Sequence, residues 1–356
     1  MSRPRTAACR PARRPRDHSA SRSDVLNGAR RGWLLAAVGA LVSVAAAYIA
    51  IRGIDLERTW QLIVRSDLRF LALATGVIAV QITLRSARWR LLLPIPPERR
   101  PAVTRVAPVL LIGYLGNAIL PARLGEAVRA ALLARRERIS ATETLGSVIL
   151  ERIIDTVTLA GFALTVAFLV GLSSQVATIG AIAIAAGLVA IVGITMAPRI
   201  LARIRIAPVE RIVEGVRGVV RGAQVADRPR TVAAAFGLSL VAWVLDAALF
   251  LLAGRALGIE LPIHAAIVIS AVAALSTAIP SAPGFIGTLE LAISTVAQAF
   301  GVEPAASLAL AIVVHAVALV PVALAGVVAA VVIGRDGSLA GLRTSIESDR
   351  RAVTSL

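Results

Sequence analysis

Long stretches of apolar residues without a charge recur along the chain. Residues 33–51 and 177–197 are two of them, and each is close to the roughly 20 residues that a helix needs to cross the hydrocarbon core of a bilayer. The pattern of such stretches predicts full membrane spans at 33–51, 69–84, 143–171, 175–197, 231–253 and 305–333.

Two further apolar regions, 106–135 and 263–300, contain residues that break helices. The interruptions are Pro121, Arg123, Gly125, Glu126 and Arg129 in the first region and Pro280, Pro283, Gly284 and Gly287 in the second. Irregular backbone at membrane depth is tolerated only where protein or a water-filled cavity satisfies its polar groups. We therefore expect two re-entrant helical hairpins, each of which enters and leaves the membrane on the same side. The predicted fold is an all-α polytopic membrane protein with about eight apolar segments.

Composition supports lipid as the solvent of this chain. Of its 356 residues 57% are hydrophobic and the mean hydropathy is +0.81, more apolar than soluble domains. The sequence predicts a membrane domain over 32–334 between a disordered basic tail at 1–31 and a polar tail at 335–356. The apolar run at 33–51 has no clear cleavage site after it, so we expect it to remain as the first span.

The placement of arginine tests this layout. The formal net charge is +17, all 38 basic residues are arginine, and 31 of them fall in segments that the layout puts on one side. Cytoplasmic loops hold the excess of basic residues, which predicts a multi-pass protein of the cell membrane with both termini in the cytoplasm. A single crossing in place of either hairpin would move basic loops to the opposite side. Anionic phospholipids are the expected partners, and nucleic acid is not.

The layout also predicts an inverted repeat. The halves 32–171 and 175–334 each read as two spans, a hairpin and a span, but with opposite orientation, and residues 116–126 faintly resemble 276–287. Inverted repeats with broken helices in matching positions are typical of transporters. Between the spans, 207–225 has the spacing of an amphipathic helix, which would either lie on the membrane surface or form a short solvated helical loop.

Candidate binding residues lie mainly at the interruptions. A helix restarting after Pro121 would point free N–H groups and Arg123 at an anion such as a phosphate, with Asn117 nearby. Arg123, Glu126 and Arg129 would then share one face, and the alternative is that Glu126 only neutralises the two arginines.

Further charged residues stand within predicted spans, where a charge is costly and usually faces a cavity or a partner. Glu151, Arg152 and Asp155 could bind substrate or form a structural ion-pair lock with Arg123 or Arg129. Glu290 follows the second interruption and Asp246 lies near Trp243 in its span. We interpret His315 as a packing residue first and a proton relay second, and His264 as interfacial.

No motif of nucleotide binding, zinc proteolysis or nucleophilic catalysis occurs, so the sequence predicts a protein without enzymatic activity. The single cysteine, Cys9, and three scattered histidines give no metal-ligand pattern, and no cofactor is expected.

Three stretches carry a family resemblance: GNAILPARLGEAVR from Gly116 to Arg129, SVILERIID from Ser147 to Asp155, and IPSAPGFIGTLE from Ile279 to Glu290. In these stretches the chain resembles the flippase-like membrane domain of lysylphosphatidylglycerol synthase, in a stand-alone form without the soluble aminoacyltransferase domain. The resemblance covers about 33–333. It implies a domain that moves a phospholipid between leaflets.

Three functions remain open from the sequence. The first is a flippase or transporter of an anionic phospholipid or lipid-linked headgroup, with Glu126, Glu290 or Asp246 available for ion coupling. The second is an intramembrane enzyme, or an accessory subunit, of lipid or cell-envelope glycolipid synthesis. The third is a membrane scaffold for a partner protein of lipid biosynthesis.

Overall fold

The fold is helical throughout the part of the chain that the computed structural model describes, namely residues 22–120, 123–170, 189, 210–277, 279 and 281–335. No β-strand occurs in these ranges. The α-helices are α1 (Arg22–Ile51), α2 (Leu56–Val64), α3 (Leu68–Leu92), α4 (Val103–Ile119), α5 (Leu124–Glu137), α6 (Ala141–Val170), α8 (Glu210–Ala223), α9 (Pro229–Ala256), α10 (Ile263–Ser276), α11 (Thr288–Ala299) and α12 (Pro304–Arg335). Short 3-10 helices are η1 (Pro97–Arg99), η4 (Gln224–Asp227) and η5 (Pro283–Phe285).

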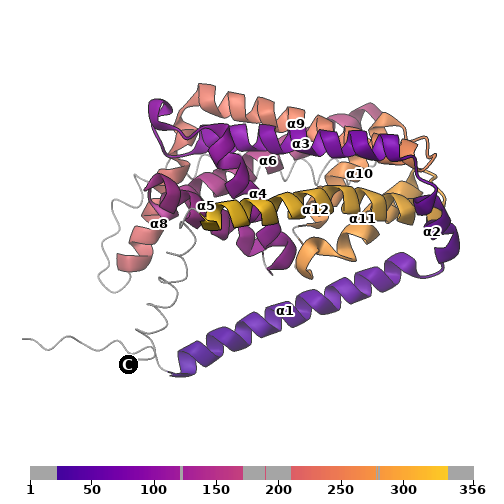
Figure 1. The fold of residues 1–356 in the computed structure, drawn as a ribbon, viewed down its shortest axis with the longest axis horizontal. Helices are drawn as coiled ribbons and strands as arrows, with labels where there is room; N and C mark the ends of the chain where they lie inside the picture. The colour runs from indigo at the N-terminus through magenta and orange to yellow at the C-terminus, as the bar shows by residue number, and fades with distance from the viewer. Residues whose placement is uncertain are drawn as a thin grey trace, which may run out of the picture.

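The longest helices run along the long axis of the molecule (Figure 1). By length and composition α3, α9 and α12 could each cross a membrane, and α1 with α2 would add a fourth span, bent by 89°. The predicted spans at 69–84, 231–253 and 305–333 fall within these three helices. The span predicted at 143–171 falls on α6, which is 30 residues long, and the span at 175–197 lies outside the described residues. The total of six spans stays a prediction.

Helix α3 is longer than the sequence predicted. The arginines at 85, 88 and 90 were expected in a loop after residue 84, but the helix continues to Leu92 and buries both Arg88 and Trp89. The helix can continue because two carboxylates of α6 neutralise Arg88, as described below. The assignment of Arg85 and Arg88 to an aqueous loop was therefore wrong.

Each interrupted region forms two short helices that pack on each other. Helices α4 and α5 contact along the first region, and α10 and α11 along the second. Close approach in the first pair depends on glycine. A Cβ added to Gly116 would lie 2.7 Å from the Cα of Gly125, and a Cβ added to Gly113 would lie 2.8 Å from the Cβ of Arg129. Small residues at such contacts are typical of packed membrane helices.

The helix contacts occur in matching pairs. Helix α3 packs on α4 as α9 packs on α10, α5 on α6 as α11 on α12, and α4 on α12 as α10 on α6. The short amphipathic helices follow the same rule, because α2 contacts α12 as α8 contacts α6. Helices α2, α3, α4, α5 and α6 of the first half therefore correspond to α8, α9, α10, α11 and α12 of the second half.

Helix α8 confirms the amphipathic helix predicted within 207–225, over Glu210–Ala223. It packs against the start of α6, where Gly146 and Gly222 bring the two backbones together. The guanidinium of Arg221 joins them, since its Nε donates to Glu143 at 3.0 Å. Both interpretations of this segment share this helix, and its position on a membrane surface stays a prediction.

We expect Gly125→Ala to lower the free energy of unfolding by about 1–3 kcal/mol, the usual cost of overpacking. An added methyl would overlap the carbonyl of Gly113 and lie 2.6 Å from Oδ1 of Asn117. The control is Gly237→Ala on α9, where no atom lies within 4 Å of an added Cβ. Thermal unfolding in detergent would compare the two. Equal midpoints would contradict the proposed packing of α4 on α5.

Candidate functional site: a charged cavity between the helix breaks

A buried ion-pair network links α3, α5 and α6. The guanidinium of Arg88 donates to Glu151 at 2.6 Å and to both carboxylate oxygens of Asp155. The second oxygen of Glu151 accepts from Arg129 at 2.7 Å. Side chains of Arg88 and Glu151 are 1% and 0% exposed, so this part of the network is closed to solvent, whereas Asp155 also lines the cavity described below.

Neutral groups complete this network. Arg88 also donates to the hydroxyl of Ser239 on α9 at 2.6 Å, which brings a fourth helix into contact with the same guanidinium. The guanidinium of Arg129 lies 4.6 Å from the ring centroid of Trp89, whose indole N–H donates to Ser147 at 3.1 Å. Breaking a buried pair leaves an uncompensated charge. These residues therefore fix the helices in place.

The first helix break positions Arg123 outside this network. Arg123 precedes α5 in the left-handed conformation, with φ of 55°. Its guanidinium donates to the carbonyl oxygen of Thr277 at 3.1 Å and to the hydroxyl of the same residue. It also lies 5.6 Å from the ring centroid of Phe285. The first break therefore contacts the second directly.

The second helix break is built on unusual backbone conformations. Gly284, Phe285 and Gly287 all have positive φ, at 75°, 61° and 89°. Helix α1 covers this break: the hydroxyl of Ser43 accepts from the N–H of Ala282 at 2.7 Å, and a Cβ on Gly39 would lie 2.9 Å from the carbonyl oxygen of Ser281. The polar backbone of the break thus finds partners inside the protein, as hydrocarbon surroundings demand.

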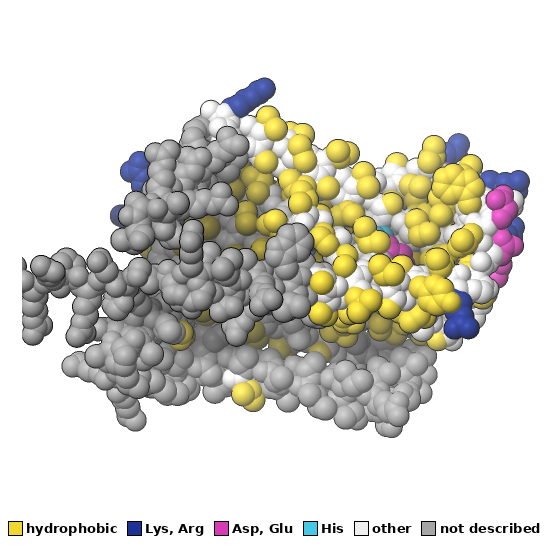
Figure 2. Space-filling view, turned by 90° about the horizontal axis from the view of Figure 1, so that it is seen from below, with side chains coloured by type: hydrophobic (Ala, Val, Ile, Leu, Met, Phe, Trp, Pro, Cys, Tyr) yellow, Lys and Arg dark blue, Asp and Glu magenta, His cyan; other side chains and the backbone are white. Residues whose placement is uncertain are grey.

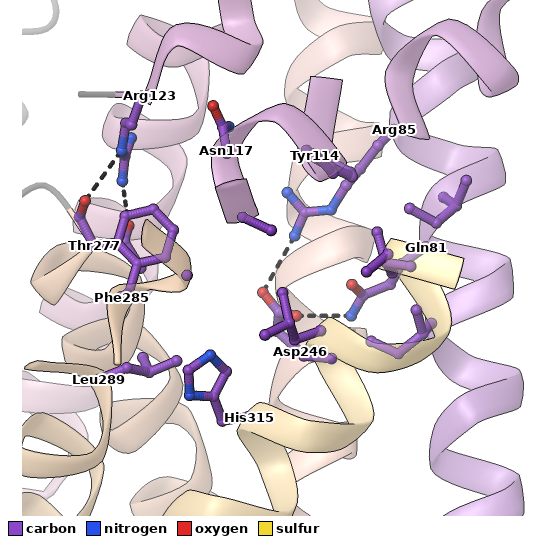
Figure 3. Close-up of a pocket in the computed structure, with 18 of the residues that line it drawn as sticks. Gln81, Arg85, Tyr114, Asn117, Arg123, Asp246, Thr277, Phe285, Leu289 and His315 are labelled. Atoms are coloured by element: carbon purple, nitrogen blue, oxygen red, sulfur yellow. Dashed lines mark hydrogen bonds and ion pairs between the residues drawn. The ribbon is translucent and has the colours of Figure 1, made fainter. Parts of the chain in front are cut away.

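Between the two breaks lies a cavity in two connected parts, of about 320 and 350 Å³. Both parts share Arg85, Arg123, Arg152, Asp246 and His315 among their lining residues. Figure 3 shows Arg123, Thr277 and Phe285 on one side, with Arg85, Gln81 and Asp246 facing them. Volumes of this size are typical of small-molecule sites.

The charges in the cavity differ in how completely they are paired. Asp246 accepts from Arg85 at 3.3 Å and from Gln81 at 2.8 Å. Arg152 lies 3.5 Å from Glu151 and from Asp155, and 3.7 Å from Glu126. Among the described residues no carboxylate lies within 4.0 Å of the guanidinium nitrogens of Arg123, whose hydrogen bonds go to neutral oxygens.

A carboxylate–histidine pair completes the site. Oε1 of Glu290 on α11 lies 2.5 Å from Nδ1 of His315 on α12, and Oε2 accepts from the N–H of Gly287 at 2.6 Å. The second of these bonds caps α11 and holds the carboxylate against the second break. His315 is directed toward the space below Asp246 in Figure 3.

The residues predicted from the sequence divide between the network and the cavity. Arg129, Glu151 and Asp155 belong to the network, and Glu151 pairs with Arg129 as the sequence suggested. Arg123 forms an ion pair with neither Glu151 nor Asp155, because Arg88 already pairs with Asp155. The cavity is lined by Asn117, Arg123, Glu126, Arg152 and Asp246, with Gly284 at its second break. Pro121 and Pro280 lie outside the described residues, and Pro283 begins η5.

The sequence analysis missed Arg85, Arg88 and Gln81. Both arginines were counted as loop residues, although their spacing of three on a helix facing Glu151 and Asp155 was a usable signal. Gln81 stood within a predicted span and was not examined as a partner of Asp246.

Comparison with known proteins identifies the family of this chain. Residues 36–326 match the family described as lysylphosphatidylglycerol synthase TM region. The chain belongs to this family. The chain is 29% identical, over 353 aligned residues, to the glycosyltransferase AglD of Haloferax volcanii, with 86% of the chain aligned. The chain spans about half the length of that relative, 54%. No solved structure matches the chain.

We expect Arg88→Met to lower the free energy of unfolding by about 3–5 kcal/mol, because Glu151 and Asp155 would lose a buried partner. Unfolding in detergent would measure the change, with Arg58→Met on exposed α2 as the control. Adding Asp155→Asn to Arg88→Met is expected to restore part of the loss, because Glu151 keeps Arg129 as its buried partner. No effect of Arg88→Met would show that the network does not stabilise the helices.

Proposed function

We propose that this protein is a transporter that moves an anionic phospholipid or lipid-linked headgroup between the leaflets of the cell membrane, with both termini in the cytoplasm. Its membership of a membrane-domain family supports a role in lipid or glycolipid processes. The observation that carries the proposal is the cavity between the helix breaks, where Arg123 has only neutral partners. A phosphate could accept from such a guanidinium without displacing a carboxylate.

The surroundings of the cavity suit a lipid with its tails outside. Figure 2 shows a broadly hydrophobic face in which histidine and acidic side chains are visible within a small window. Large apolar side chains near the breaks are exposed, among them Ile119, Leu124 and Ile286. An amphipathic lipid could place its headgroup in the cavity and leave its acyl chains against these side chains.

The fold supports a re-entrant and inverted arrangement. Helices α4, α5, α10 and α11 have 17, 14, 14 and 12 residues, shorter than the roughly 20 needed to cross. The matching contacts of α2–α6 and α8–α12 are those expected of two copies of one unit. In such transporters the substrate binds where the broken helices meet, which here is at Arg123 and Thr277.

We expect Arg123→Gln to slow movement of phosphatidylglycerol between leaflets by about tenfold or more, because a hydrogen bond to a charged group contributes about 1.5–3 kcal/mol. The assay uses reconstituted vesicles with chain-labelled phosphatidylglycerol and an impermeant quencher. Arg58→Gln is the control for charge. Transport at the wild-type rate by Arg123→Ala combined with Glu126→Ala would exclude this site.

The Glu290–His315 pair is our candidate for ion coupling. Among the acids lining or bordering the cavity, Glu126, Asp155 and Asp246 face arginines, whereas Glu290 faces a histidine within the described chain. Arg123 on α5 and Asp246 with Arg85 are the other charged groups around the same cavity. Histidine changes charge near neutral pH, which suits a group that takes up and releases a proton.

Coupling to protons predicts that an imposed pH gradient changes the transport rate of the wild-type protein. Glu290→Gln and His315→Gln are each expected to abolish this response, because neither leaves a pair that can share a proton. His264→Gln serves as the control, since His264 packs edge-on against Phe300. The coupling is wrong if both variants respond to the gradient as the wild type does.

A second candidate function is favoured by the similarity to AglD, which is named a glycosyltransferase. This chain could act as an enzyme, or as an accessory subunit of a partner protein, in glycolipid synthesis. Formation of a product from a labelled lipid-linked sugar by the purified protein would identify an enzyme. Headgroup movement without product would favour the transporter.

A further inference from the structure

A second cavity, separate from the site between the breaks, lies between α4 and α12. Its volume is about 540 Å³, and α4 lines it with Thr104, Arg105, Pro108 and Leu111. Helix α5 contributes Arg136. Helix α12 contributes residues of one face, namely Ala325, Val328, Ala329, Val332 and Ile333. We call this cavity the α4–α12 groove. It shares no lining residue with the cavity at Arg123.

The α4–α12 groove has a closed apolar end and a basic end. Near its closed end α4 and α12 are in close contact, because a Cβ added to Gly326 would lie 2.8 Å from the carbonyl oxygen of Leu111. The wall toward the surroundings is apolar and open, with Val328 63% and Val332 54% exposed. Arg105 and Arg136 contribute the only charges among the residues that line it.

Neither arginine is neutralised by the described part of the chain. Arg105 and Arg136 have no hydrogen bond or ion pair with a described side chain, and no acidic residue lines the groove. Helix α4 also begins beside them without a side-chain cap at Ala102. Uncapped N–H groups at a helix start attract anions. Two guanidinium groups and the start of a helix, which can all bind an anion, therefore lie at one end of an apolar groove.

We propose that the α4–α12 groove binds one anionic phospholipid, with its phosphate at Arg105 and Arg136 and an acyl chain along Leu111, Val328 and Val332. An apolar channel alone would accept any lipid, and two arginines alone would accept free phosphate. The combination selects a ligand that has an acyl chain and a negative headgroup. Because the groove is separate, this lipid is a bound companion of the protein and not the transported substrate.

Native mass spectrometry of the full chain, purified with phosphatidylglycerol or phosphatidylcholine, would test this site. Arg105→Gln with Arg136→Gln is expected to reduce the population that carries one phosphatidylglycerol by at least about tenfold, equivalent to about 1.4 kcal/mol. The matched control is Arg99→Gln with Arg135→Gln, which removes two exposed arginines nearby. Ala325→Phe tests the acyl-chain part of the groove without changing charge, and is expected to give the same loss.

Four results would overturn the proposal. The first is an equal loss of bound phosphatidylglycerol in the control pair, and the second is equal retention of phosphatidylcholine. The third is displacement of the lipid by inorganic phosphate, and the fourth is a wild-type dimer that Ala325→Phe dissociates, which would mean that a second copy of the chain fills the groove. The transport assay remains independent: loss of the bound lipid with Arg123-dependent transport intact separates this site from the proposed function.

Discussion

The cost of placing charges within an apolar helix bundle governs this structure. Arg88, Glu151, Asp155 and Arg129 could not remain ionised and buried as separate groups, because each would lose its hydration without compensation. Their mutual hydrogen bonds join α3, α5 and α6, and Ser239 adds α9. Four helices, α3, α5, α6 and α9, must therefore adopt one arrangement, and the breaks and the cavity are positioned by it.

This constraint separates two classes of charged residue. The arginines inside the network already pair with carboxylates, so an anion that bound them would have to compete with those carboxylates. Arg123 is held instead by the oxygens of Thr277 and the ring of Phe285, and no described carboxylate forms an ion pair with it. A headgroup that bound there would replace weak neutral contacts by a charge-assisted bond. The network joins the helices, and in the proposed function Arg123 would select an anion.

The sequence predicted what depends on local pattern. The length of the apolar stretches predicted α3, α9 and α12, and proline and glycine residues predicted the breaks. Charged residues inside an apolar stretch indicated Glu151 and Asp155. It did not predict the length of α3, because an arginine such as Arg88 is interpreted as the end of an apolar segment when the carboxylates that neutralise it are not known. Those partners come from α6, 63 and 67 residues away. The contact of Arg123 with Thr277, 154 residues away, was hidden for the same reason.

The two breaks occupy matching places in the contact pattern but carry different chemistry. The first places a permanent cation, Arg123, in one cavity with Glu126, whereas the second places Glu290 against His315. Arginine stays charged at any physiological pH, so the first break can attract a phosphate at all times. In the proposed function the second break would carry the ion coupling. Duplication of one structural unit, followed by divergence of its charges, would thus separate substrate binding from ion coupling across a single cavity.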